Sequence, residues 1–238
     1  MIAKTKMSVI DRPSPNFDDR ESGAPDMIVL HYTGMPTGAE ALQRLCDGQT
    51  KVSAHYLVER DGRIYRMVAE EKRAWHAGIS HWAGRDGIND YSIGIEIVNS
   101  GHWFGYQDFP PVQMRAVIEL VAEIVTRRNI TKEMIVGHSD IAPTRKEDPG
   151  ERFPWVELAA RNLTLFPFDG EAMAEDLLPD YEQSLTALRG IGYGFEVPHH
   201  ASAVLAFQRR FCPKALGLGL DPLTRTAILH VRQQITKT

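Results

Sequence analysis

Three side chains of this sequence could together hold a metal ion for hydrolysis. His31 ends an apolar run at residues 27–30, and His138 closely follows another at residues 134–136. Two strand ends can converge on one ion even when their histidines are far apart in the chain. A hydrolytic zinc site usually takes three protein ligands and keeps a fourth position for water. Asp148, in a loop rich in proline and glycine, is the candidate third ligand.

Two charged residues near these positions could do the accompanying acid-base chemistry. Glu96 interrupts the apolar alternation of residues 92–98, where an unpartnered buried carboxylate would cost several kcal/mol. Gly94, on the same face, leaves room for a ligand to approach. Lys146 lies two residues before Asp148 in an extended loop, so it projects to the same side and could stabilise an oxyanion. Taken alone, each histidine could instead be a satisfied hydrogen-bonding residue, and Lys146 could be a solvated surface lysine.

The elements that would position these residues form an α/β fold. Residues 27–34, which begin with four apolar residues in a row, predict a buried strand, and residues 38–48 predict an amphipathic helix. Residues 52–70 alternate around Asp61 and Gly62, as a β-hairpin does. A second helix is predicted over 111–128, ending in two arginines that suit the carboxyl-terminal dipole. We therefore predict a mixed central sheet flanked by helices.

A change of pattern between residues 166 and 180 predicts a domain boundary. Proline, glycine and acidic residues interrupt the periodicity there. Beyond it, three short amphipathic segments predict a small three-helix bundle, the last of them starting with Asp221 as N-cap and Pro222 in the first turn. We assign residues 1–172 to the catalytic domain and 173–238 to the bundle.

The composition is that of a soluble globular protein and limits the possible partners. Of the 238 residues, 43% are hydrophobic and 24% charged, and the formal charge of −4 argues against nucleic-acid binding. No segment has the roughly 20 apolar residues that cross a bilayer. Cys46 and Cys212 are expected to be buried thiols rather than a disulfide. The amino-terminal residues show no export signal, which predicts a cytoplasmic protein, with the periplasm or cell envelope as the alternative.

Five segments in order resemble the zinc-dependent N-acetylmuramoyl-L-alanine amidases of the Amidase_2 type. They are HYTG, VSAHYLVERDGRIY, RAWHAG, NDYSIGIEI and GHSDIAPTRKEDPG, and they fall within residues 27–155. The resemblance implies that His31, His138 and Asp148 bind Zn²⁺ and that Glu96 and Lys146 are catalytic. The tail segments SAVLAFQRRF and GLDPLTRTAI are similar to the three-helix peptidoglycan-binding domain of cell-wall hydrolases.

The resemblance also bears on three further positions. It implies that His76 lines the substrate cleft, and Asn89 is assigned to substrate binding with it. Related phage amidases carry a tyrosine where this sequence has Ala54, so catalysis is expected to depend on Glu96. His55, within an alternating strand, is expected to be structural.

The expected substrate is peptidoglycan or a muropeptide fragment, with the 1,6-anhydro form as one possibility, and the oligomeric state stays open. Two alternatives remain. The chain could be a non-catalytic peptidoglycan receptor, although such relatives typically lack the third ligand, which Asp148 supplies here. It could also be a zinc peptidase that cuts within the stem peptide.

Overall fold

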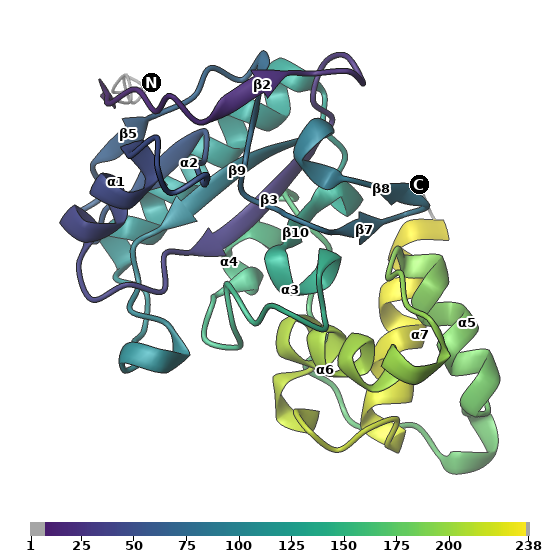
Figure 1. The fold of residues 1–238 in the computed structure, drawn as a ribbon. Coiled ribbons are helices and arrows are strands. Elements are labelled where there is room, and N and C mark those ends of the chain that lie inside the picture. The colour runs from purple at the N-terminus through teal and green to yellow at the C-terminus, as the bar shows by residue number, and fades with distance from the viewer. Residues whose placement is uncertain (1–7, 237–238) are drawn as a thin grey trace. The chain divides into compact units, whose positions relative to one another are not determined.

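The computed structural model describes residues 8–236 and has the mixed α/β fold that the sequence predicts (Figure 1). The expectation about an export signal falls partly on residues 1–7, outside the described part. The main sheet has six strands in the order β1-β5-β4-β9-β3-β10. Their bounds, in that order, are Val9–Asp11, Ile64–Arg66, Tyr56–Val58, Ser92–Ile97, Met27–Tyr32 and Ile135–Gly137. The pairs β2–β6 (Phe17–Asp19, Lys72–Ala74) and β7–β8 (His81–Trp82, Arg85–Asp86) are antiparallel.

The chain divides into two compact units, residues 1–76 with 89–130, and residues 77–88 with 131–238. This division follows spatial contacts, and the predicted boundary at residue 172 stays a prediction. The first unit holds the central strands together with α1 (Gly38–Cys46) and α2 (Pro111–Arg128). The second holds β10, α3 (His138–Ile141), α4 (Trp155–Ala159) and the helices of the tail.

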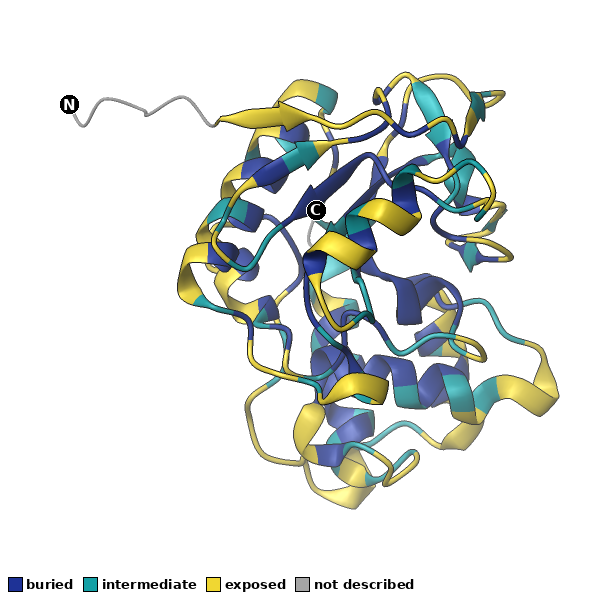
Figure 2. Ribbon diagram, turned by 60° about the vertical axis from the view of Figure 1, so that its left-hand side comes forward, coloured by how far each residue is buried: buried dark blue, intermediate teal, exposed yellow. Residues whose placement is uncertain are grey.

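The central strands β3 and β9 are buried because both of their faces are covered. They pair in parallel over six residues, and their isoleucine, leucine and valine side chains are fully buried. Parallel strands covered on both sides read as continuous apolar runs, which is the pattern of residues 27–30. The predicted hairpin is confirmed, since β4 and β5 pair antiparallel around Gly62, whose φ of +89° suits glycine. Buried residues accordingly concentrate in the central strands and the inner helix faces (Figure 2).

Both predicted helices of the first unit are present. Helix α1 starts after Thr37, whose side chain accepts a hydrogen bond from Glu40 N. Its buried residues Ala41 and Leu45 pack in one cluster with Leu57 of β4. On α2, the buried Gln113 donates from Nε2 to Val58 O at the end of β4 and to Val98 O directly after β9, at 3.1 and 2.9 Å. A buried amide that satisfies two strand ends fixes the helix against the sheet.

The two arginines that end α2 have a more specific partner than the helix dipole. Arg127 and Arg128 both bond the carboxylate of Glu70, at 2.5 and 2.9 Å, and Tyr56 donates to it at 2.8 Å. Burial raises the pKa of Glu70, but the hydrogen bonds from Arg127, Tyr56 and Arg128 outweigh it and leave the pKa below its ordinary value. The sequence indicated the charge pattern but not this carboxylate, which lies 57 residues before Arg127.

The tail forms the predicted three helices, α5 (Tyr181–Ile191), α6 (His200–Phe211) and α7 (Pro222–Thr236). They appear in green to yellow in Figure 1. Asp221 accepts a hydrogen bond from Thr224 N at 2.9 Å, so the predicted N-cap with Pro222 as the first helical residue is confirmed. Cys212 is buried and free as expected, whereas Cys46 is free but only half-buried. Within the described residues, no helix is long and apolar enough to cross a membrane.

Candidate metal centre and active site

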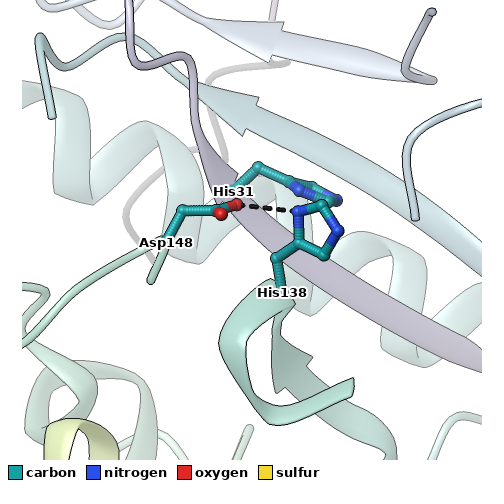
Figure 3. Close-up of side chains that lie close together, drawn as sticks. All are labelled: His31, His138 and Asp148. Atoms are coloured by element: carbon teal, nitrogen blue, oxygen red, sulfur yellow. Dashed lines mark hydrogen bonds and ion pairs between the residues drawn. The ribbon is translucent and has the colours of Figure 1, made fainter. Parts of the chain in front are cut away.

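His31, His138 and Asp148 lie together, as the sequence predicts for a metal site (Figure 3). Each offers one ligand atom, these atoms lie within 4.8 Å of one another, and all three residues are buried. His31 is carried by β3, and His138 is the first residue of α3, directly after β10. Asp148 lies in the loop that follows α3, where its backbone carbonyl accepts a hydrogen bond from Ser139 N at 2.8 Å.

The donor set fits a zinc ion. Two imidazoles and a carboxylate are ligands that zinc takes in hydrolytic sites. His138 Nδ1 lies 3.1 Å from Asp148 Oδ2, and two ligand atoms of a tetrahedral zinc site are about 3.3 Å apart for bonds of about 2.05 Å. The contact between them is therefore close to the spacing that a shared ion requires.

The Nε2 atoms of His138 and His31 have partners that orient the two imidazole rings. His138 Nε2 lies 3.2 Å from Ala77 O, and His31 Nε2 lies 3.0 Å from His76 Nδ1. Since a carbonyl oxygen only accepts, His138 Nε2 carries the proton in this contact, so Nδ1, which faces Asp148, is the candidate ligand atom. The contact with His76 likewise engages Nε2 of His31, so Nδ1 is the candidate ligand atom of that ring. Such partners of the second ring nitrogen commonly orient metal-binding histidines.

Strand register places Glu96 beside His31. The two residues are directly paired on the adjacent parallel strands β9 and β3, so their side chains point to the same face of the sheet. Lys146 is half-buried in the loop of Asp148, and its backbone N–H donates to Ala142 O at 3.1 Å. No carboxylate within residues 8–236 pairs with its ammonium group. The roles of Glu96 and Lys146 remain predictions.

The two residues predicted to bind substrate lie next to each other. Asn89 Oδ1 accepts a hydrogen bond from the backbone N–H of His76 at 3.0 Å, and His76 as a residue is 9% exposed. Substrate contact by either residue stays a prediction. Sequence reasoning missed the contact of His76 with His31, because the two are 45 residues apart.

The prediction that Gly94 leaves space for a ligand was wrong. A Cβ built on Gly94 would lie 2.4 Å from Cγ of His76, so the imidazole of His76 fills that space. The absence of a side chain at this position is what allows the His76 ring to approach β9 closely.

His55 has the structural role that its strand pattern predicts. Its ring is completely buried, Nδ1 accepts from Gly94 N–H at 2.9 Å, and Nε2 lies 3.0 Å from Lys72 O. With Nδ1 accepting, the neutral ring carries its proton on Nε2 and donates it to Lys72 O, while Arg20 Nη2, which donates to Ser92 O, lies 3.0 Å from the same nitrogen. Burial lowers the pKa of His55 to about 3. The residue therefore stays uncharged at neutral pH and fixes β9 two residues before Glu96.

Comparison with known proteins agrees with this geometry. The family model described as N-acetylmuramoyl-L-alanine amidase, Amidase_2, matches residues 21–151, more than half of the chain. The chain is 41% identical over 153 residues to the N-acetylmuramoyl-L-alanine amidase AmiD of Escherichia coli, a match covering 59% of this chain and 54% of AmiD. It thus spans about half the length of that relative. It is 38% identical to the 1,6-anhydro-N-acetylmuramyl-L-alanine amidase AmpD of Haemophilus influenzae, over 60% of this chain and 85% of AmpD.

One solved structure extends the similarity to nearly the whole chain. The complex of Escherichia coli AmiD with the substrate anhydro-N-acetylmuramic acid-L-Ala-D-gamma-Glu-L-Lys superposes with a TM-score of 0.79 and 30% identity. The superposition covers 94% of this chain and 99% of that one. The order of the motifs, the gathered His-His-Asp cluster and the family match lead to one conclusion: the chain belongs to the Amidase_2 family of N-acetylmuramoyl-L-alanine amidases.

Proposed function

We propose that this chain uses zinc to hydrolyse the amide bond between N-acetylmuramic acid, including its 1,6-anhydro form, and L-alanine of peptidoglycan stem peptides. The observation that carries the proposal is the buried cluster of His31, His138 and Asp148, with Glu96 in register beside His31. The substrate class follows from the relatives, whose names specify muramyl-L-alanine amides. Muropeptides are accordingly the proposed partners.

The residues of the site divide the chemistry between them. His31, His138 and Asp148 would hold the ion, which, when bound, supplies a Lewis acid and lowers the pKa of water. Glu96 accepts a proton from the attacking water as the water oxygen forms a bond to the lactyl carbonyl carbon. The ammonium group of Lys146 stabilises the negative charge that develops on the carbonyl oxygen. Glu96 then gives its proton to the nitrogen of L-alanine as the C–N bond breaks.

Product analysis distinguishes this proposal from its alternatives. The zinc-loaded protein is incubated with a purified anhydro-muropeptide, and the products are identified by mass spectrometry. Free anhydro-N-acetylmuramic acid and an intact peptide that begins with L-alanine support the amidase. A shortened stem peptide still attached to the sugar supports a peptidase, and tight binding without cleavage supports a receptor.

A Glu96→Gln variant tests the acid-base step separately from metal binding. The substitution keeps the shape of the side chain but removes its basicity, so hydrolysis should fall by about 10²- to 10⁴-fold. Zinc content, measured by atomic absorption, should stay at the wild-type value. Turnover at the wild-type rate would remove Glu96 from the mechanism.

We also propose that the helices α5, α6 and α7 form a peptidoglycan-binding domain at residues 173–238, after a catalytic domain at 1–172. The motif resemblance of the tail supports this assignment, and the AmiD superposition, which covers 94% of this chain, extends into the tail. A pull-down with insoluble peptidoglycan would test it. The experiment compares the full chain with a variant that carries substitutions on the exposed face of α5. Fractionation of the native protein would test the compartment.

A further inference from the structure

A buried ionic network joins the tail to the segment that carries His138. Asp140, two residues after His138, is fully buried in α3. Its Oδ2 accepts hydrogen bonds from Arg210 at 2.6 Å and from Gly137 N at 2.7 Å, and its Oδ1 accepts from Tyr193 at 2.6 Å. Both long side chains come from the tail, Tyr193 from just beyond α5 and Arg210 from α6.

Arg210 contacts the segment of His138 on both sides of that residue. Besides Asp140, its guanidinium donates to Ile135 O at the start of β10 and to Thr164 Oγ1, each at 2.8 Å. It also lies over the ring of Trp155, 4.3 Å from the centroid, and its side chain is only 2% exposed. A planar guanidinium with fixed donors and a stacked face has one arrangement here, so it fixes both ends of the turn that presents His138.

The neighbouring Arg209 likewise contacts the chain on both sides of Asp148. Arg209 bonds Glu147 at 3.1 Å and lies 3.5 Å from Glu151, so its partners flank Asp148 on both sides. Successive residues of a helix point about 100° apart, which lets Arg209 and Arg210 reach two different segments. Ser139 N and Asp148 O join those segments at 2.8 Å.

We propose that Arg210, assisted by Tyr193, is a positioning residue for the metal centre, acting through Asp140 on the backbone that carries His138. The tail helices would then be part of the framework of the active site in addition to any role in wall binding. This inference rests on the proposed zinc function. It predicts that loosening the network weakens metal binding and turnover more than it weakens substrate binding.

The test compares three variants of the full-length protein. Arg210→Met removes the charge at similar length, and Tyr193→Phe removes only one hydrogen bond to Asp140. Arg225→Met is the matched control, because Arg225 is 14% exposed in the same bundle and bonds Glu175 and Pro179 O, away from the His138 segment. Zinc affinity is measured by competition with a chromophoric chelator, alongside Tm, kcat and KM.

We expect Arg210→Met to weaken zinc binding by about 10-fold, the lower range for residues that support metal ligands, and to lower kcat with KM nearly unchanged. Arg225→Met should lower Tm and leave zinc affinity within about two-fold. Unchanged zinc affinity in Arg210→Met overturns the proposal. If that variant does not fold, Tyr193→Phe decides. A measurable loss of zinc affinity in Tyr193→Phe supports the proposal, and an unchanged zinc affinity refutes it. If the wild type binds no zinc, the proposed function fails and this inference with it.

Discussion

The buried, neutral His55 should make the stability of this protein strongly dependent on pH. In the folded state burial lowers the pKa of His55 to about 3, while its ordinary value is 6.5. The unfolded chain therefore binds a proton in the window between these values and the folded protein does not. Stability from this residue is complete above pH 6.5 and is lost as the pH falls toward 3.

At a pH above the folded pKa of His55, the loss of stability caused by its protonation in the unfolded chain depends little on the exact folded pKa. At pH 4.5, two units below the unfolded pKa, protonation stabilises the unfolded state by about 2.7 kcal/mol, at 1.36 kcal/mol per unit. Any folded pKa below about 4 gives nearly the same value. A His55→Asn variant removes the titration, while its amide oxygen can still accept from Gly94 N–H.

Urea unfolding at pH 7.5 and 4.5, with chelator present so that metal binding does not contribute, measures this difference. The stability gap between wild type and His55→Asn should change by about 2.7 kcal/mol between the two pH values, in favour of the variant at low pH. His199→Asn, at an exposed position, is the control and should show no such change. A His55 gap that stays constant within about 0.7 kcal/mol, a quarter of the expected change, would refute the reasoning from burial.

Two further substitutions test the charges described above. Lys146→Met should lower kcat by about 10²-fold and leave zinc content unchanged, because it removes one oxyanion-stabilising group; an unchanged kcat would assign Lys146 to the solvated surface. Glu70→Gln should lower the free energy of unfolding at pH 7 by about 2 kcal/mol, since Arg127 and Arg128 lose their shared carboxylate but remain partly exposed. The folded pKa of Glu70 is lowered, so this gap should close as the pH falls through that value; a gap that persists in strong acid would contradict the assignment.

The sequence predicted the parts of the fold that depend on local pattern. Helix α2 starts and ends where its periodicity does, and the N-cap at Asp221 follows from residue type alone. The candidate ligands His31 and His138 could be found because each closely follows an apolar run, and the family motifs supplied the pairing that local pattern does not. The position of the His76 ring could not be found in this way. A missing side chain at Gly94 shows that something approaches closely, but not whether it is a substrate or a neighbouring imidazole.

The same limit applies to the two arginines of α6, whose partners can be identified in the structure but not in the sequence. In the sequence they are two cations in the last turn of a helix, which the dipole alone would favour. In the structure Arg210 is buried against Asp140, and such a pair stabilises a fold no more than well-packed apolar residues would. What the pair does provide is a fixed orientation of the backbone around His138, because the guanidinium donates to groups before and after that residue at once. A metal centre needs its ligands fixed to within a few tenths of an ångström, and this network supplies that constraint from the tail.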